Sequence, residues 1–492
     1  MSLININNLT FGYDTSYDNV FDAVSFQIDT SWKLGLTGRN GRGKTTLLHL
    51  LMGKYEYSGS IQAAVTFDYF PYEVRNKACD TIGIIEEIVP QHEHWELQRE
   101  LSLLDVEEEV LYRPFATLSN GEQTKVLLAA LFLKENNFLL IDEPTNHLDM
   151  EARGKVGQYL QSKKGFILVS HDRAFLDQCV DHILSINRNT IEIQRGNFSS
   201  WQQNKELQDR FELAENEKLK KEIKTLTAAA RRTADWSEKI EKTKNGTKLS
   251  GIKPDKGHIG HQAAKMMKRS KTLETRQENA IEEKAGLLKN IETADSLSIN
   301  PKIYHCSRLI DAENLSILYD GRKIVEKVSF SVDTGDRVAL IGKNGSGKTS
   351  ILKLLLGEEI AFDGSLRIGS GLSISYVSQD TSFLKGGLKD FARREGIEES
   401  LFKAILRKLD FSRIQFEKDM TEYSEGQKKK VLIAKSLCQQ AHLYIWDEPL
   451  NFIDVISRMQ IEELLLRHKP TMIFVEHDRA FHNRIATKQI FL

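Results

Sequence analysis

Two copies of one set of phosphate-binding motifs occur in this 492-residue chain, in the same order. The first copy has G-R-N-G-R-G-K-T at residues 38–45, and the second has G-K-N-G-S-G-K-T at residues 342–349. Glycines let backbone N–H groups curl around a phosphate, a lysine adds positive charge, and the threonine hydroxyl can bind Mg²⁺. The predicted phosphate-binding residues are Gly38, Arg39, Asn40, Gly41, Arg42, Gly43, Lys44, Thr45 and Thr46, and then Gly342, Lys343, Asn344, Gly345, Ser346, Gly347, Lys348, Thr349 and Ser350.

An acidic residue follows a short apolar run about a hundred residues after each loop. Asp142 lies 98 residues after Lys44, and Asp447 lies 99 residues after Lys348. An aspartate at the end of a buried strand is the usual second holder of Mg²⁺ beside such a loop. Thr45, Asp142, Thr349 and Asp447 are therefore predicted metal ligands. Because the two lysines are 304 residues apart, the repeat indicates duplicated domains and a tandem nucleotide hydrolase that uses Mg²⁺.

The elements around these motifs have the pattern of an α/β fold. Residues 3–11 alternate between apolar and polar side chains, which favours a strand, and residues 33–37 lead directly into the first glycine-rich loop. Residues 47–52 are expected to form the helix that this loop opens. The apolar runs at 138–141 and 166–169 are typical of parallel strands buried on both faces.

The segment between the two copies has a different composition. From about residue 201 to 297, apolar residues recur near helical spacing, while glycines and a proline interrupt the pattern between residues 245 and 260. Residues 218–276 hold 17 Lys or Arg against 6 Asp or Glu, although the net charge of the whole chain is −1. This pattern predicts a long basic helical hairpin with an irregular tip; the alternative is a solvated linker without a task. The expected domains are residues 1–200, 201–300 and 301–492.

Bulk properties argue for a cytoplasmic location. No run approaches the ~20 apolar residues that a membrane-spanning helix needs. The start of the chain lacks the basic and apolar regions of a signal peptide. The four cysteines (Cys79, Cys179, Cys306 and Cys438) lack metal-ligand spacing and fit a reducing compartment.

Signature sequences 21 residues before each strand aspartate resemble those of ATP-binding-cassette domains. These are L-S-N-G-E-Q at 118–123 and Y-S-E-G-Q at 423–427, and S-H-D and E-H-D follow downstream at 170–172 and 476–478. The resemblance implies two such α/β P-loop domains joined by the long α-helical hairpin linker. It also implies that Glu143 and Glu448 are catalytic bases and that His171 and His477 contact the γ-phosphate. Tyr13 and Tyr319 would stack on adenine, although both could be ordinary strand-end aromatics.

In that family the two domains pack head to tail within one chain, so the resemblance implies a monomer with an intramolecular dimer of cassettes. The Lys44 loop would share one ATP with the second signature, and the Lys348 loop would share the other with the first. A serine and a glycine at the start of a helix can bind phosphate through backbone N–H groups. The signature residues concerned are Ser119, Gly121 and Glu122, and Ser424, Gly426 and Gln427.

Three departures from the family pattern predict that the two sites are inequivalent. The glutamine that would contact Mg²⁺ and ATP is present in the second domain as Gln379, but Tyr72 stands at that position in the first. The second signature carries Glu425 where glycine is usual. The motif T-N-H-L-D at 145–149 becomes L-N-F-I-D at 450–454.

Two cassettes joined by a long basic helical pair resemble the ABC-F proteins, and the sequence around the first loop resembles their antibiotic-resistance Lsa group. The resemblance implies an ATP-hydrolysing ribosomal protection protein. It would bind the 70S ribosome at the E site, contact 23S rRNA and P-site tRNA, and displace lincosamides, streptogramin A and pleuromutilins. The predicted ribosome contacts are Lys242, Lys244, Lys248, Leu249, Ile252, Lys253 and Lys256.

Three other functions remain as alternatives. The first is a housekeeping ABC-F translation factor that acts on the ribosome without a resistance role. The second is the ATPase subunit of a transporter, although twin-cassette subunits of that kind lack a basic hairpin. The third is a chromosome-handling coiled-coil ATPase, whose arms would be longer and regular in heptads.

Overall fold

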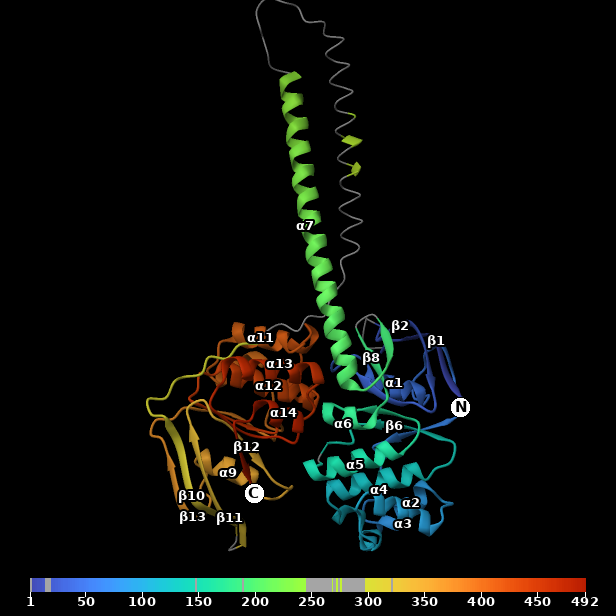
Figure 1. Ribbon diagram of the computed structural model, residues 1–492, viewed down its shortest axis with the longest axis vertical. Helices are drawn as coiled ribbons and strands as arrows, with labels where there is room; N and C mark the ends of the chain where they lie inside the picture. Colours follow the sequence, from blue (N-terminus) through green and yellow to red (C-terminus); the bar gives the residue numbers. More distant parts are fainter. Residues whose placement is uncertain are drawn as a thin grey trace, which may run out of the picture. The chain divides into compact units, whose positions relative to one another are not determined.

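The computed structural model describes residues 2–13, 19–146, 148–187, 190–244, 268, 271–272, 275–276, 297–319 and 322–492, apart from the side chains of residues 226 and 229–244. The chain divides into two compact units, residues 1–201 with 294–492 and residues 202–293. The first unit contains two cassettes of the same design, and the second contains most of one long helix (Figure 1).

The first cassette has two sheets. A three-stranded antiparallel sheet has the order β2 (Phe21–Asp29), β1 (Leu3–Phe11), β4 (Ser58–Gln62). A six-stranded sheet has the order β5 (Thr66–Phe70), β6 (Asn137–Asp142), β7 (Phe166–Val169), β3 (Lys33–Thr37), β8 (His182–Ile186), β9 (Ile191–Arg195). Its strands are parallel except for the antiparallel pair β8 and β9. β6 and β7 are almost wholly buried, as their continuous apolar runs predicted.

Six α-helices accompany these strands in the described part of the first cassette. They are α1 (Lys44–Leu51), α2 (Thr81–Ile88), α3 (His94–Leu103), α4 (Asn120–Phe132), α5 (Met150–Ser162) and α6 (Arg173–Cys179), with short 3₁₀ turns at Glu108–Tyr112 and Phe115–Thr117. The predicted helix after the first glycine-rich loop is α1, which begins at Lys44 itself, three residues earlier than expected. The phosphate-binding lysine therefore belongs to the first helical turn.

The second cassette repeats the arrangement. Its antiparallel sheet has the order β11 (Arg322–Asp333), β10 (Arg308–Tyr319), β13 (Phe362–Ile368). Its parallel sheet has the order β14 (Ile374–Val377), β15 (Leu443–Asp447), β16 (Met472–Val475), β12 (Arg337–Ile341), β17 (Lys488–Phe491). The helices are α9 (Lys348–Leu355), α10 (Leu388–Arg394), α11 (Glu399–Lys408), α12 (Glu425–Cys438), α13 (Val455–His468) and α14 (Arg479–Ile485), with 3₁₀ turns at Ile414–Phe416 and Met420–Glu422.

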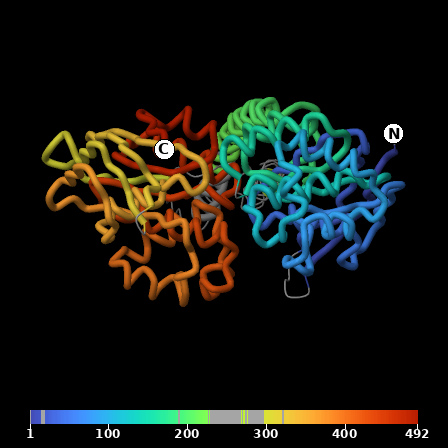
Figure 2. The backbone as a smooth tube through the Cα atoms, turned by 90° about the horizontal axis from the view of Figure 1, so that it is seen from below, coloured from blue at the N-terminus to red at the C-terminus, as the bar shows by residue number. Residues whose placement is uncertain are grey.

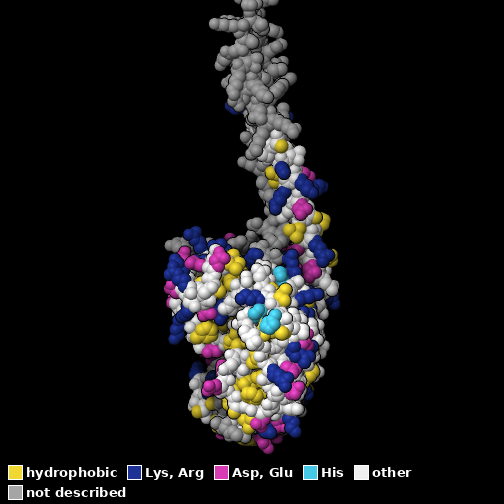
Figure 3. Space-filling view, turned by 90° about the vertical axis from the view of Figure 1, so that its left-hand side faces the viewer, with side chains coloured by type: hydrophobic (Ala, Val, Ile, Leu, Met, Phe, Trp, Pro, Cys, Tyr) yellow, Lys and Arg dark blue, Asp and Glu magenta, His cyan; other side chains and the backbone are white. Residues whose placement is uncertain are grey.

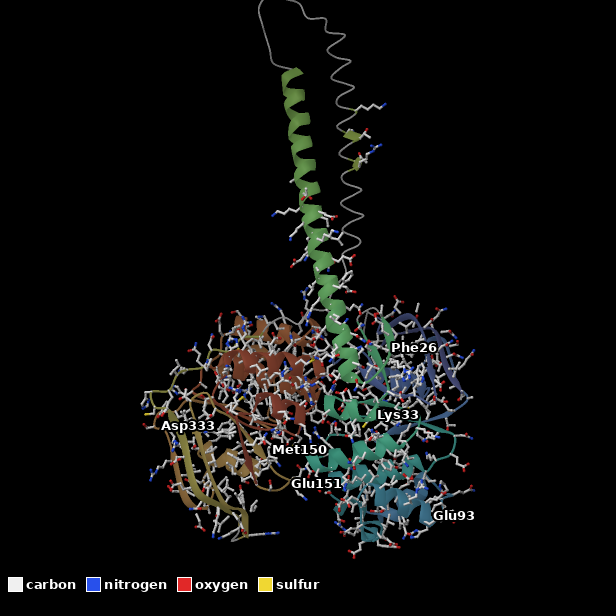
Figure 4. All side chains as sticks on the ribbon, viewed as in Figure 1. Phe26, Lys33, Glu93, Met150, Glu151 and Asp333 are labelled. Carbon is white, nitrogen blue, oxygen red and sulfur yellow. The ribbon has the colours of Figure 1, made fainter. Side chains whose placement is uncertain are left out.

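The cassettes share one compact unit and contact each other, and Figure 2 shows the first in blue to green and the second in yellow to red. Arg173 of α6 and Arg484 of α14 both pair with Glu462, whose side chain is fully buried in α13. Lys343 Nζ lies 2.9 Å from an oxygen of Glu151, which is labelled at the start of α5 in Figure 4. A buried carboxylate without its arginines would be strongly destabilising, so Glu462 ties the two cassettes together.

The second unit begins within α7 (Phe198–Lys244), a helix of 47 residues, and contains all of it from residue 202 onward. At ~1.5 Å per residue, such a helix is about 70 Å long. α7 is the first arm of the predicted hairpin. The irregular tip lies outside the described residues, together with the predicted contacts Lys248, Leu249, Ile252, Lys253 and Lys256. Lys242 and Lys244 lie in the last turns of α7.

Candidate nucleotide-binding sites

The first glycine-rich loop wraps around the ammonium group of Lys44. Lys44 Nζ donates to the backbone carbonyls of Gly38 and Arg39 at 2.8 and 3.2 Å and lies 3.3 Å from Asn40 Oδ1. Gly43 has φ +89°, and a Cβ there would lie 2.5 Å from a methyl group of Val20. Burial lowers the pKa of Lys44. The loop therefore holds a buried cation on carbonyls, ready to exchange them for phosphate oxygens.

The second loop has the same geometry. Lys348 Nζ donates to the carbonyls of Gly342 and Lys343 at 2.9 and 2.8 Å. Gly347 has φ +91°, and burial also lowers the pKa of Lys348. Both loops end at the first residue of a helix, so backbone N–H groups and the positive end of the helix dipole face the same point.

The strand aspartates differ between the two cassettes. Thr45 Oγ1 donates to Asp142 Oδ2 at 2.9 Å, and the hydroxyl of Tyr69 donates to the same oxygen at 3.0 Å. Both carboxylate oxygens of Asp447 are buried, and the Thr349 hydroxyl is the side-chain hydrogen-bonding group that acts on its pKa. Burial, followed by the charge of Glu448, raises the pKa of Asp447 to about 6. A buried carboxylate beside a threonine hydroxyl supplies the oxygen ligands that a divalent cation prefers, so these residues fit Mg²⁺ in the second cassette.

Each candidate base lies beside its histidine. Glu143 Oε1 is 3.3 Å from His171 Nε2, and Glu448 Oε1 is 3.4 Å from His477 Nε2. Both glutamates directly follow a strand and have positive φ values of 52° and 47°. This uncommon backbone conformation for a non-glycine residue turns the side chain away from the strand path, toward the loop region.

The electrostatic surroundings of the two glutamates are opposite. Burial, with the charge of Asp142, raises the pKa of Glu143 to about 8. Burial also acts on Glu448, but the hydrogen bond and charge of His477 outweigh it and leave the pKa below its usual value. Glu448 Oε2 accepts from Gln379 Nε2 at 2.9 Å and from Asn451 Nδ2 at 2.6 Å. Glu143 Oε1 is buried and accepts no hydrogen bond within the described part of the chain.

Burial also acts on the histidine of the first cassette. It lowers the pKa of His171 well below the usual value, and the charge of Lys44 adds to this effect. His171 is therefore neutral at physiological pH and can donate one hydrogen bond and accept another.

The signature serines cap two helices. Ser119 Oγ accepts from the N–H of Glu122 at 3.2 Å, and Glu122 Oε2 accepts from the N–H of Ser119 at 2.8 Å. Ser424 and Gln427 make the same reciprocal pair at 3.3 and 3.0 Å at the start of α12. These capping boxes fix where α4 and α12 begin and aim their free N–H groups outward.

A cavity of about 690 Å³ brings the second loop and the first signature together. Its lining includes Ser119, Gly121, Glu122, Asn344, Gly345, Gly347, Lys348, Thr349, Ser350, Gln379, Glu448 and His477. These are residues that the sequence assigned to one ATP site, drawn from both cassettes. Their proximity agrees with the head-to-tail expectation for the Lys348 site.

The Lys44 loop lies directly against the second cassette. Asn40 Nδ2 donates to the backbone carbonyl of Phe452 at 2.9 Å, and Arg39 lies 3.4 Å from Asp410. A Cβ on Gly426 would lie 2.4 Å from that carbonyl and 3.0 Å from Asn40 Nδ2. The second signature therefore lies close to the first loop, and a side chain at Gly426 would meet both the Asn40 side chain and the Phe452 carbonyl of its own cassette.

Other predicted residues have contacts of their own. The hydroxyl of Tyr13 is hydrogen-bonded to Thr46 Oγ1 at 2.7 Å, and its ring packs edge-on against Phe11. Tyr319 is 40% exposed at the end of β10. The N–H of Arg42 donates to the carbonyl of Arg39, Gly41 has open space around it, and the Ser346 hydroxyl is buried without a partner among the described residues.

The sequence reading missed two groups at these sites. Tyr69 precedes Tyr72 by three residues, and the strand pairing places it opposite Leu140, where its hydroxyl reaches Asp142. Asn451 is part of the motif at 450–454, but its contact with Glu448 depends on the turn after β15. A tyrosine near the end of a strand beside the acidic strand was the one available signal for Tyr69.

The family model described as ABC transporter matches residues 21–146 and 325–451, just over half of the chain. The chain belongs to the ATP-binding cassette family. It is an ATPase of the ABC-F type, as the motifs predicted.

Two relatives match almost the whole of this ABC-F ATPase. The ribosome protection protein VmlR of Bacillus subtilis (strain 168) is 28% identical, over 100% of this chain and 86% of VmlR. The ATP-binding protein Uup of Buchnera aphidicola is 26% identical, over 99% of this chain and 80% of Uup.

Solved structures share the fold. The RNase-L inhibitor has a TM-score of 0.63 at 17% identity, over 99% of this chain and 87% of that one. An archaeal ribosome recycling factor, aABCE1, solved in complex with the ribosomal stalk protein aP1, has a TM-score of 0.62 at 19% identity, over 98% and 87%. Within the described residues, no helix is both long and apolar enough to cross a membrane.

Proposed function

We propose that this ABC-F ATPase is a ribosomal protection protein that binds the E site and displaces lincosamides, streptogramin A and pleuromutilins. The observation that carries the proposal is the similarity to a named ribosome protection protein over the entire chain, linker included. The paired cassettes and the excess of positive charge at residues 218–276 support it. Its partners would be 23S rRNA and P-site tRNA in the cytoplasm.

Charge distribution supports the assignment of the linker to RNA. Residues 218–276 carry a surplus of eleven positive charges (17 against 6), so the rest of the chain has a net charge of −12. The face of the cassettes in Figure 3 mixes Lys and Arg with Asp and Glu. Phosphate backbones attract concentrated positive charge, so the linker is the segment suited to RNA, through Lys242, Lys244, Lys248, Lys253 and Lys256.

Chemistry at each cassette would divide among the predicted residues. Lys44 and Lys348 would hold the phosphates of ATP, while Thr45 with Asp142 and Thr349 with Asp447 and Gln379 would hold Mg²⁺. When bound, Mg²⁺ would neutralise charge on the phosphate oxygens. Glu143 and Glu448 would orient the attacking water and accept its proton, and His171 and His477 would contact the γ-phosphate.

Drug susceptibility of a sensitive bacterium tests the proposal. Expression of the wild-type chain should raise the inhibitory concentrations of lincosamides and pleuromutilins, and expression of Glu143→Gln/Glu448→Gln should not. Leu249→Ala/Ile252→Ala, at the predicted tip, should keep ATPase activity and ribosome binding but lower resistance. Wild-type expression without any resistance, in cells where the chain still binds ribosomes, would favour the housekeeping translation factor instead.

A further inference from the structure

The segment after β14 is tied to the start of α12 in the second cassette. Thr381 Oγ1 donates to Glu425 Oε2 at 2.6 Å, and Lys429 Nζ donates to the carbonyl of Ser378 at 2.9 Å. Glu425 is the residue that replaces glycine in the second signature. The departure from the family pattern thus has a partner in the structure, namely the hydroxyl of Thr381.

Each contact joins a buried side chain to a partly exposed partner, and the side chain of Glu425 is 50% exposed. Thr381 is 4% exposed and Lys429 is 2% exposed. Burial lowers the pKa of Lys429, while hydrogen bonds from Thr381 and Lys428 hold the pKa of Glu425 below its usual value against the effect of burial. Hydrogen bonds in which one partner is ionised are stronger than those between neutral groups. The segment 378–381 and the first turn of α12 should therefore move as one body.

The two ends of this body lie at different ATP sites. At one end, Gln379 donates to Glu448 Oε2 beside the Lys348 loop. At the other end, Gly426 lies so near the Lys44 loop that a Cβ on it would be 3.0 Å from Asn40 Nδ2. A displacement of Gln379 would therefore be passed to the surface that faces Asn40.

The first cassette has different residues at the matching positions. The strand registers make Val377 and Phe70 equivalent, so Val74 is the residue of the first cassette that corresponds to Thr381. The signature alignment makes Asn120 and Thr124 the equivalents of Glu425 and Lys429. Valine has no hydroxyl to donate to a carboxylate. Threonine is too short to reach the backbone carbonyl that Lys429 reaches in the second cassette. The first cassette lacks the side chains that make this link, so the device is one-sided.

We propose that the Thr381–Glu425 and Lys429–Ser378 contacts couple the two ATP sites, so that ATP at the Lys348 site sets the activity of the Lys44 site. The proposal rests on the assignment of the two loops as ATP sites. Phosphate and Mg²⁺ at the Lys348 site would draw Gln379 away from Glu448. The linked segment would then shift α12 and with it the signature that faces the Lys44 loop. Such coupling acts in both directions at equilibrium.

Steady-state ATPase assays can isolate this coupling. In Glu448→Gln, hydrolysis is confined to the Lys44 site while the Lys348 site still binds ATP; adding Lys348→Ala removes that binding. The ratio of the two Lys44-site rates measures the coupling, and allosteric coupling between sites is typically about 5- to 150-fold. With residues 381 and 429 unchanged, which we call the parent, we expect this ratio to be at least about five. When Thr381→Val/Lys429→Thr is added to both of these chains, the ratio should fall to within about twofold of one.

Matched variants separate coupling from damage. Thr381→Ser keeps the hydroxyl and should keep the ratio. Lys435→Thr removes a cation of α12 that pairs with Glu395 and should also keep it. Should the double variant fail to fold, Thr381→Val and Glu425→Gln are measured singly. A ratio near one in the parent, or a parent-like ratio in folded Thr381→Val/Lys429→Thr, would overturn the proposal. An unaltered ATPase rate in Glu143→Gln/Glu448→Gln would instead overturn the site assignment itself.

Discussion

At the scale of single residues, the two cassettes share their reactive groups but differ in what surrounds them. Glu448 has two amide donors and a lowered pKa, whereas Glu143 is buried beside Asp142 and its pKa is raised. A general base acts in its deprotonated form, so the same residue type has a different availability at the two sites.

This difference predicts two pH profiles. In Glu448→Gln, turnover depends on Glu143, whose pKa of about 8 leaves it mostly protonated at pH 7. ATPase activity should therefore rise by about tenfold between pH 7 and pH 9. In Glu143→Gln, turnover depends on Glu448, which is already deprotonated, so the rate should change by less than about twofold over the same range. Identical profiles for the two variants would contradict the structure.

Tyr69 gives a second test at this scale. Its hydroxyl donates to the Asp142 oxygen that also accepts from Thr45, so it competes with Mg²⁺ for that oxygen. Tyr69→Phe in the Glu448→Gln background should lower the Mg²⁺ concentration that gives half-maximal ATPase activity by about tenfold or more, since a hydrogen bond to a charged group contributes about 1.5–3 kcal/mol. Tyr376→Phe, at the matching position of β14, is the control and should have a smaller effect.

At the scale of elements, the starts of α4 and α12 have the same sequence feature but different surroundings. In both helices the N-cap residue is a serine, and a glycine follows two residues later. Gly121 has open surroundings, since the nearest atom to a Cβ there is 3.6 Å away, but Gly426 lies against backbone at 2.4 Å. The same sequence feature therefore meets different packing in the two halves.

Alanine substitutions should reveal that difference in stability. Gly426→Ala should reduce the free energy of unfolding by about 1–3 kcal/mol, because the new methyl group overpacks the contact with Phe452 and Asn40. Gly121→Ala should be neutral or slightly stabilising, because alanine restricts the unfolded chain without a clash. Denaturant unfolding of both variants without nucleotide measures the effect. Equal losses would show that the close approach at Gly426 is absent in solution.

At the scale of the whole molecule, charge is separated along the chain. The segment that includes α7 carries the positive surplus, and the remaining residues are net negative. A protein that used its entire surface for RNA would spread its basic residues, so this distribution favours RNA contact by the linker.

Salt dependence tests that use of charge. Replacing Lys242, Lys244 and Lys248 by alanine should reduce the slope of log binding constant against log salt by about 2–3, because each phosphate contact contributes about 0.7–0.9. Ribosome co-sedimentation over a range of potassium concentrations measures the slope. Lys353, Lys385 and Lys418, exposed or half-exposed lysines of the second cassette, form the matched control triple. A slope that stays at the wild-type value would make the linker a spacer.

The chain's own sequence was enough to predict the duplicated loops, the strand aspartates, the signatures and hence a tandem ATPase. These features are local: a glycine-rich turn between a strand and a helix works through its own backbone, so residues 38–45 and 342–349 carry their chemistry in their order. Boundaries were less certain, as the start of α1 at Lys44 shows.

The sequence predicted that the two sites differ, but only the tertiary structure decided which contacts make the difference. Asn40 and Phe452 are 412 residues apart, and Tyr69 reaches Asp142 over 73 residues, so these contacts depend on how distant segments of the chain meet. The raised pKa of Glu143, the cavity beside Lys348 and the link from Thr381 to Glu425 all depend on how buried surfaces meet. Burial sets the strength of charge interactions, and burial is a property of the packed chain rather than of its sequence motifs.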